Sequence, residues 1–162
     1  MKTLILVRHA KAARDQIALS DHDRPLTDRG RRDAPRMAER LHRRGAQPDL
    51  LLSSPARRAL ATAQLMARPL RYDRASIVVD ERLYPGATAA VLEVIHGLDP
   101  PLQCVMLVGH DPGLSELARR FCRAVDHLPT CTVVEFAFDA DTWSQLGAIG
   151  FVTTTIDCPP KA

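Results

Sequence analysis

Two histidines and two arginines stand where the chain leaves an apolar run or enters a predicted helix. Arg8 and His9 follow directly on one apolar run, and His110 follows another much later in the chain. Arg58 falls in the first turn of a predicted helix between them. A guanidinium binds phosphate oxygens bidentately, and an imidazole can act as a nucleophile or as a hydrogen-bond donor. Brought together, these four side chains would suit the binding and transfer of a phosphoryl group.

Continuous apolar runs predict the strands that would bring these residues together. Residues 3–7 (TLILV), 49–52 (DLLL) and 104–108 (CVMLV) each lead into polar residues, and residues 77–79 form a short β-branched run. Apolar runs without alternation are typical of strands covered on both faces, as in a parallel sheet. The carboxyl ends of such strands lie at one edge of the sheet, where the sites of open α/β proteins are found.

Amphipathic helices are expected between the strands. Apolar residues recur with helical spacing in four segments, residues 34–41, 59–66, 91–98 and 114–121. Ser54-Pro55 and Asp111-Pro112 each place a capping residue before a proline, which predicts that two of the helices begin at these prolines.

Two late segments, residues 133–138 and 149–155, are joined by a polar turn with no long helix between them, which predicts an antiparallel pair of strands. The expected fold class is therefore α/β with three layers. These are a mostly parallel central sheet with helices on both faces, and the sheet includes an antiparallel strand or strands near the C-terminus. A length of 162 residues favours a single domain over residues 1–162.

The composition is that of an ordinary globular protein and excludes several classes. With 46% hydrophobic and 25% charged residues, the chain is expected to be neither disordered nor fibrous. No apolar run reaches the roughly 18 to 20 residues that cross a membrane, and the apolar segment before Arg8 is too short for a signal peptide. We therefore expect a cytoplasmic protein without a membrane partner.

The cysteines and histidines do not have the spacing of a metal site. The four cysteines are widely separated, with no C-x-x-C pair, and the six histidines form no H-x-x-x-H pair. In the absence of a secretory signal, reduced thiols are expected rather than disulfides. We therefore expect neither a metal nor another cofactor.

Eight arginines lie between Arg24 and Arg44, interleaved with Asp28, Asp33 and Glu39. Such mixed charge is typical of a solvated helix face, although an acidic partner would also fit it. Aromatic residues make up only 4% of the chain, too few for the stacking platforms of single-strand binders. No nucleic-acid partner is expected, and the sequence leaves the oligomeric state and the role of this basic surface open.

Four motifs occur in an order that resembles a known superfamily. They are L-V-R-H-A-K-A from Leu6, R-P-L-T-D-R-G from Arg24, S-S-P-A-R-R-A-L-A-T-A from Ser53 and V-G-H-D-P-G-L from Val108. Together they resemble the signatures of the histidine phosphatase superfamily, the phosphoglycerate-mutase-like group. The short chain and its R-H-A-K-A variant are most similar to the SixA-type phosphohistidine phosphatases. Ala10 stands where the superfamily usually has glycine, and its methyl group limits a positive φ at that position.

The resemblance implies a role for each core residue. His9 is similar to the nucleophile that becomes transiently phosphorylated. Arg8, Arg58 and His110 resemble the pocket that holds the phosphoryl oxygens and stabilises the transition state, which agrees with the importance of positioning and charge in phosphoryl transfer. Lys11 is a further candidate for substrate binding. The cationic groups supply the countercharge, so no metal is implied.

The resemblance leaves the general acid open between two carboxylates. D-E-R-L-Y (residues 80–84) resembles the mutase segment with a catalytic glutamate, which would make Glu81 the group that protonates the leaving group and later activates water. SixA-type proteins are less regular in this segment, so Asp80 is the alternative. A protonated phosphohistidine leaves more readily than an alkoxide, and for such a substrate neither carboxylate is required.

The leading interpretation is a metal-independent phosphatase with a phosphohistidine intermediate. Its substrate would be phosphohistidine on a protein, such as a histidine-phosphotransfer domain, or a small phosphate ester. So short a chain has little material for a lid, which predicts a shallow pocket that admits a protein-borne phosphoryl group. A phosphoglycerate-mutase-like phosphoryl transferase is the alternative, disfavoured by the same lack of enclosing segments. A non-catalytic phosphate-binding module is the third, and the presence of all four core residues argues against it.

Overall fold

The structure, a computed structural model, describes residues 1–14 and 19–161. In this part of the chain the strands are β1 (Lys2–Arg8), β2 (Leu50–Ser53), β3 (Val78–Val79), β4 (Cys104–Gly109), β5 (Val133–Phe138) and β6 (Thr153–Asp157). The α-helices are α1 (Asp28–Arg43), α2 (Arg57–Ala67), α3 (Thr88–His96) and α4 (Gly113–Phe121). Short 3₁₀ helices are η1 (Asp21–Asp23), η2 (Arg74–Ser76), η3 (Glu81–Leu83) and η4 (Trp143–Gln145).

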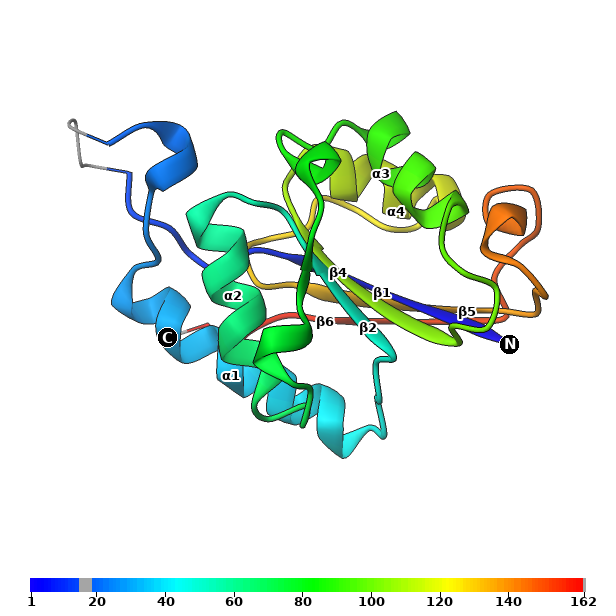
Figure 1. Ribbon diagram of the computed structural model, residues 1–162, viewed down its shortest axis with the longest axis horizontal. Coiled ribbons are helices and arrows are strands. Elements are labelled where there is room, and N and C mark those ends of the chain that lie inside the picture. The colour runs from blue at the N-terminus through cyan, green and yellow to red at the C-terminus, as the bar shows by residue number, and fades with distance from the viewer. Residues whose placement is uncertain (15–18, 162) are drawn as a thin grey trace.

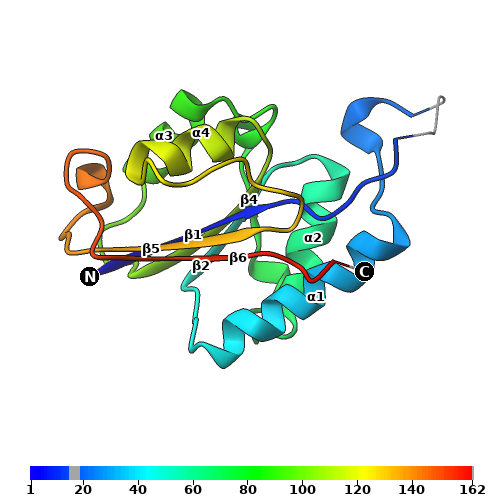
Figure 2. The same ribbon diagram turned by 180° about the vertical axis from the view of Figure 1, so that it is seen from behind.

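The strands form one mixed sheet in the order β3-β2-β4-β1-β5-β6. The strands β3, β2, β4 and β1 are parallel, whereas β5 lies antiparallel between β1 and β6. Figure 1 shows α1 and α2 on one side of this sheet and α3 and α4 on the other, and the view from behind in Figure 2 shows the same layers. The predicted three-layer α/β class, with an antiparallel pair near the C-terminus, is confirmed.

Alternate residues of the central strands face two different cores, which explains their uninterrupted apolar sequences. In β1, Leu4 and Leu6 pack in the core with α3 and α4, whereas Ile5 and Val7 pack in the core with α1 and α2. All four are fully buried. Because each buried aliphatic side chain contributes about 1.5–3 kcal/mol, this packing fixes the strands and the positions of their carboxyl ends.

Two helices begin later than the prolines predicted. The first turn of α2 starts at Arg57 rather than at Pro55, because Ser54 bends the chain before the helix: its Oγ accepts the N–H of Ala56 at 3.1 Å. The helix α4 starts at Gly113, directly after its proline. Both helices therefore start one or two residues after the predicted positions.

The last strand also begins later than predicted, at Thr153 rather than at residue 149. The segment before it contains η4, whose Trp143 is fully buried and donates its indole N–H to the carbonyl of Leu102 at 3.0 Å. After this anchored turn, Ile149 forms only an isolated bridge with Leu146, and residues 150–152 lie outside the strand.

Part of the basic helix face is paired with carboxylates. Arg40 donates from Nε and Nη2 to both oxygens of Asp157 on β6, at 2.7 Å each, and Arg44 contacts Asp157 and Glu135. Burial alone would raise the pKa of Asp157, but the hydrogen bonds from the two arginines outweigh it and lower the pKa. The bidentate pair therefore ties α1 to the edge strand of the sheet.

Candidate active site

The ends of three strands meet at one edge of the sheet. The strands β1 and β4 are parallel neighbours with Arg8 beside Gly109, so the residues that follow, His9 and His110, come side by side. The N–H of His9 donates to the Gly109 carbonyl at 3.0 Å, and the two imidazole centroids are 5.2 Å apart. The end of β2 lies beside them, because the N–H of Ser54 donates to the backbone of β4 at 3.1 Å.

A pocket of about 310 Å³ opens at this edge. Its lining includes the core residues predicted from the sequence, Arg8, His9, Arg58 and His110, together with Lys11. In total five lysine or arginine side chains and two carboxylates line it. The volume is at the lower end of the range for ligand sites, so the pocket suits a small anionic group rather than a whole large substrate.

His9 carries an imidazole prepared for nucleophilic attack. Its Nδ1 lies 2.7 Å from the carbonyl oxygen of Ala10, which can only accept, so Nδ1 carries the proton and Nε2 keeps its lone pair. Burial lowers the pKa of His9 from 6.5 to about 3; the hydrogen bond to Ala10 opposes this shift, and the cationic groups nearby add to it. At neutral pH the ring is uncharged.

His110 is oriented by Ser54. Its Nε2 lies 2.7 Å from Ser54 Oγ, which also accepts the N–H of Ala56 at 3.1 Å. Ser54 Oγ has no other acceptor for its proton among the described residues, so the hydroxyl donates to Nε2, and the neutral ring carries its own proton on Nδ1. Burial, and next the charge of Arg58, lower the pKa of His110 to about 4. His110 thus offers Nδ1–H as a donor while uncharged.

Each active-site arginine leaves one buried N–H unused. Arg58 donates from Nη1 and Nη2 to the carbonyl (2.7 Å) and the carboxylate (3.1 Å) of Asp21. Arg8 donates from Nη1 to the carbonyl of Leu128 at 2.7 Å. Burial lowers the pKa of Arg8, and Asp111, 3.8 Å away, opposes the shift, so the guanidinium keeps its charge. The Nε groups of both arginines are buried and unpaired among the described residues.

Three buried nitrogens of this pocket's residues therefore lack a partner in the described part of the chain: Arg8 Nε, Arg58 Nε and His110 Nδ1. Buried donors are nearly always satisfied, and leaving one unpaired costs about 1–3 kcal/mol. Three such donors around one pocket indicate a ligand with several acceptor oxygens. A phosphoryl group has three strong acceptor oxygens and negative charge, and it fits this requirement.

The loop that carries the nucleophile is fastened to α2. Thr62, one turn after Arg58, accepts the N–H of Ala10 at 3.0 Å through Oγ1 and donates to the carbonyl of Arg58 at 2.7 Å. Ala10 is fully buried and is not among the described residues with positive φ. Alanine therefore fits this position without the glycine that the superfamily usually has there.

Two glycines of the motifs allow backbone segments to pack closely around the pocket. A Cβ at Gly30, in the first turn of α1, would lie 2.3 Å from the carbonyl oxygen of Lys11. A Cβ at Gly113, which begins α4, would lie 1.9 Å from the carbonyl oxygen of Gly86. Any side chain at these positions would push α1 or α4 away from the loops that line the site.

A carboxylate and a phenol that the sequence analysis did not identify also line the pocket. The hydroxyl of Tyr84 donates to Asp21 Oδ2 at 2.8 Å, and Arg24 Nε donates to Asp21 Oδ1 at 3.1 Å. The hydrogen bond from Tyr84 lowers the pKa of Asp21 to about 2, and the same bond raises the pKa of Tyr84. Asp21 is therefore an ionised group held by Tyr84 and by two arginines.

Glu81 is not brought into the pocket. It begins η3, its side chain is exposed, and it does not line the cavity. Asp80 is also engaged elsewhere, since it accepts the N–H of Arg82 at 3.0 Å and pairs with that guanidinium at 2.8 Å, which lowers its pKa. Asp21 and Asp111 are the carboxylates that line the pocket.

Two further properties concern the whole described part of the chain, residues 1–14 and 19–161. Within it, no group of three or more His, Cys, Asp or Glu side chains is arranged to hold a metal ion. None of its helices has the length and apolar character needed to cross a membrane.

The sequence matches a known family over its N-terminal half. Residues 4–84 match the histidine phosphatase superfamily (branch 1). The chain belongs to this superfamily. An uncharacterized chloroplastic protein of Arabidopsis thaliana is 32% identical over 156 residues, which cover 91% of this chain and 72% of the relative.

Solved structures of the superfamily share the fold. SixA of Agrobacterium tumefaciens superposes with a TM-score of 0.77 at 29% identity, over 85% of this chain and 92% of that chain. A protein histidine phosphatase SixA complexed with tungstate gives a TM-score of 0.78 at 24% identity, over 96% and 94% of the two chains. Among histidine phosphatases the chain is SixA-like, which supports phosphatase activity on phosphorylated substrates.

Proposed function

We propose that the protein is a phosphohistidine phosphatase that passes the phosphoryl group first to Nε2 of His9 and then to water. The observation that carries the proposal is a set of three buried donors without partners among the described residues, on Arg8, Arg58 and His110, which line the same pocket as the neutral His9. These donors suit the charge that a phosphoryl group carries in the transition state.

In the first step the Nε2 lone pair of His9 attacks phosphorus. An Nε2–P bond forms, the bond between phosphorus and the leaving group breaks, and its electron pair departs with the leaving group. The proton on Nδ1 stays in place, because the carbonyl of Ala10 accepts it at 2.7 Å and holds the ring in that tautomer. The pocket donors bind the three equatorial oxygens during the transfer.

In the second step water attacks the phosphorylated His9. A P–O bond forms, the Nε2–P bond breaks and returns its electron pair to Nε2, and inorganic phosphate leaves with both protons of the water. The enzyme regains its neutral imidazole, so the cycle uses no other reactant.

The protonation of the pocket favours phosphohistidine as the substrate. With a pKa of about 2, Asp21 is ionised at neutral pH and has no proton to give to a leaving group. An alkoxide leaving group requires such a proton, whereas an imidazole already protonated on its other nitrogen does not. Relatives of this fold are named as histidine phosphatases, and one was solved with tungstate, an oxyanion of phosphate-like shape.

Labelling with radioactive phosphate tests the covalent step. Wild-type protein incubated with labelled phosphohistidine or phosphoramidate should carry an acid-labile, base-stable label, and His9→Ala should carry none and show no turnover while remaining folded. Turnover should be the same with and without EDTA. Label on a serine, or full activity in His9→Ala, would exclude the mechanism.

A further inference from the structure

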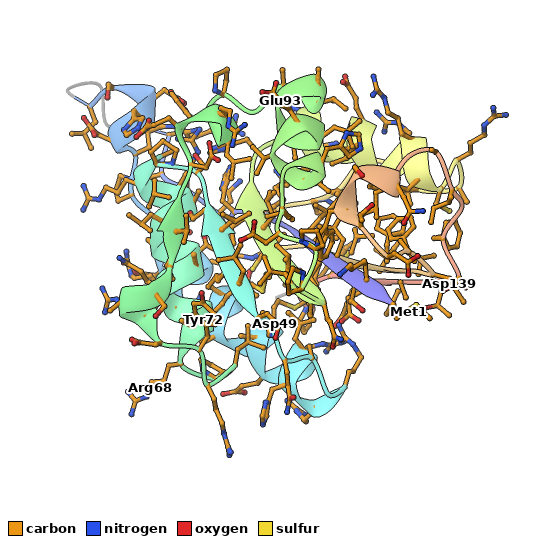
Figure 3. All side chains as sticks on the ribbon, turned by 45° about the vertical axis from the view of Figure 1, so that its right-hand side comes forward. Met1, Asp49, Arg68, Tyr72, Glu93 and Asp139 are labelled. Carbon is orange, nitrogen blue, oxygen red and sulfur yellow. The ribbon has the colours of Figure 1, made fainter. Side chains whose placement is uncertain are left out.

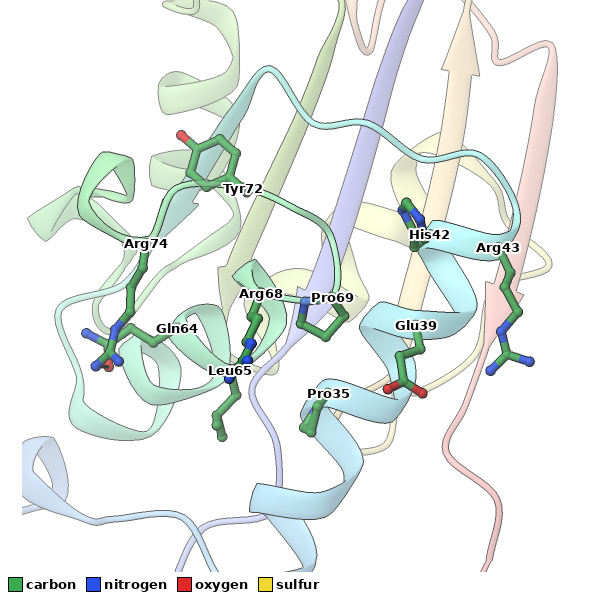
Figure 4. Close-up of a pocket in the computed structure, with 10 residues that line it drawn as sticks. All are labelled: Pro35, Glu39, His42, Arg43, Gln64, Leu65, Arg68, Pro69, Tyr72 and Arg74. Atoms are coloured by element: carbon green, nitrogen blue, oxygen red, sulfur yellow. Dashed lines mark hydrogen bonds between the residues drawn. The ribbon is translucent and has the colours of Figure 1, made fainter.

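Two depressions lie next to each other on α1 and α2, outside the catalytic pocket. The larger, of about 1150 Å³, lies between the two helices, with Pro35 on α1 and Leu65 on α2 among its apolar residues, as Figure 4 shows. The smaller, of about 280 Å³, includes Pro25 and Leu26. Both are lined by Gln64, Leu65 and Arg74, so they are neighbours, and the two together are here called the α1–α2 groove.

The α1–α2 groove is apolar at its centre and positively charged around it. Its lining contains five arginines and one carboxylate, that of Glu39. The arginines are Arg31, Arg43, Arg57, Arg68 and Arg74. Of these, Arg31 pairs with Asp28, whereas the other four are exposed and form no ion pair with a described residue. Positive charge without internal partners attracts an acidic surface and steers its approach.

The groove adjoins the catalytic pocket through two pairs of consecutive residues. Arg58 lines the pocket while Arg57 lines the groove, and likewise Arg24 lines the pocket while Pro25 lines the groove. The first turn of α2 therefore directs one arginine to the phosphoryl site and the next to the adjacent surface. The smaller depression and the phosphoryl site therefore lie on two sides of the first turn of α2.

The size of the catalytic pocket indicates what kind of molecule this is. About 310 Å³ of polar, cationic space accommodates a phosphorylated side chain and little more. The remainder of a macromolecular substrate must then lie on the surface beside the opening. The groove is an adjacent surface with both apolar area and unpaired charge, which are the ingredients of a protein interface.

We propose that the α1–α2 groove docks the phosphorylated protein itself, through a surface that combines carboxylates with exposed apolar side chains. The proposal rests on the proposed function, since it assumes that the phosphoryl group of the docked protein enters the pocket of His9. It assigns Arg57 and Arg74 to partner recognition and not to the chemistry. Small substrates, which do not extend past the pocket, do not use the groove.

The test compares a protein substrate with a small one. The double variant Arg57→Glu/Arg74→Glu reverses two groove charges, and glutamate at the first turn of α2 is compatible with the helix dipole. Its kcat/KM for a histidine-phosphotransfer domain phosphorylated on histidine should fall at least about tenfold, because two attractions become repulsions. Its kcat/KM for phosphoramidate should stay within about twofold of the wild type.

A matched control is available on the opposite face of the sheet. Arg119→Glu/Arg120→Glu makes the same change in net charge at two exposed positions of α4, and it should leave both rates near the wild type. Raising the salt concentration should reduce the wild-type rate on the phosphoprotein and affect the groove variant less, because salt screens exposed charges.

Several results would overturn the docking proposal. If the wild type hydrolyses the phosphoprotein and the groove variant does so equally well, the groove is not the docking surface, although the proposed function stands. Equal losses on both substrates would mean that the change disturbs Arg58 rather than docking. If the wild type is a dimer that the groove variant converts to a monomer, the groove joins two copies of the chain. If the wild type hydrolyses phosphoramidate but not the phosphoprotein, the docking proposal fails while the proposed chemistry of His9 stands; if it hydrolyses neither, both proposals fail.

Discussion

Acidification should destabilise the folded protein through its two buried histidines. His9 and His110 are 7% and 5% exposed, and burial lowers their pKa values to about 3 and about 4 from an ordinary 6.5. Below pH 6.5 the unfolded chain therefore binds protons at these positions while the folded chain does not. Stability consequently decreases as the pH falls from about 6.5 toward the folded pKa values.

The size of the effect follows from the two pKa values. Between pH 7 and pH 5 the unfolded histidine becomes almost fully protonated, whereas folded His9 stays neutral, and this difference removes about 2 kcal/mol of stability per histidine. The result depends on the ordinary pKa of the unfolded side chain and hardly on the folded value, provided that the latter lies well below 5. His9→Gln should remove the contribution of His9 to this loss of stability, because glutamine does not titrate and can still donate to the carbonyl of Ala10.

Urea unfolding at pH 7, 6 and 5, followed by far-UV circular dichroism, measures these free energies. The wild type should lose about 2 kcal/mol more than His9→Gln between pH 7 and pH 5. Phosphate buffers must be avoided, because a ligand that binds only the folded state would add stability of its own. If both proteins lose the same stability over this interval, His9 is not a buried neutral imidazole and the reasoning about the nucleophile is wrong.

Substitutions at four positions test the roles of individual side chains in and around the pocket. Arg58→Lys should lower kcat by about 10² to 10³, because lysine cannot supply the paired donors of a guanidinium; a loss below threefold would contradict its role. Ser54→Ala should lower kcat/KM about tenfold by releasing the His110 tautomer, and Ser54→Thr should restore most of it. Asp21→Asn should strengthen inhibition by inorganic phosphate about tenfold, because it removes the anion that competes for Arg58, and weaker inhibition would count against this competition. Glu81→Gln should leave kcat/KM within about twofold for phosphoramidate and for an alkyl phosphate, since the side chain lies outside the pocket; a selective loss on the alkyl phosphate would restore it as the general acid.

The fold was predictable because its strands are covered on both faces. Residues 3–7 and 104–108 form continuous apolar runs, because alternate side chains face the two cores. This pattern can be recognised in the sequence without any knowledge of tertiary contacts. The helix starts were less predictable. Ser54 does not cap α2: its Oγ accepts the N–H of Ala56, the residue before the helix, and bonds to His110, a residue far away in the sequence.

The site was predictable where its residues follow predicted strands or begin a predicted helix. Arg8, His9 and His110 meet because β1 and β4 are parallel neighbours; the strand pattern predicted a shared direction of the strands, and the structure adds their order. Asp21 and Tyr84 were missed because they come from segments without apolar periodicity, whose places depend on contacts with Arg58 and with each other. The only signal for either was its position beside a motif, Asp21 before R-P-L-T-D-R-G and Tyr84 at the end of D-E-R-L-Y.

The charges of the pocket define what its chemistry requires from the substrate. Its positive charge comes from its five lysine and arginine side chains and not from the histidines, which are neutral well above pH 4. Phosphoryl binding therefore does not weaken when the imidazoles lose their protons, and His9 remains a nucleophile over the same range. Of the carboxylates that line the pocket, Asp21 is ionised, so its network stabilises charge and supplies no proton. The proposed function fits this network, because a protonated phosphohistidine departs without a proton from the enzyme, whereas the leaving group of a sugar or serine phosphate requires one.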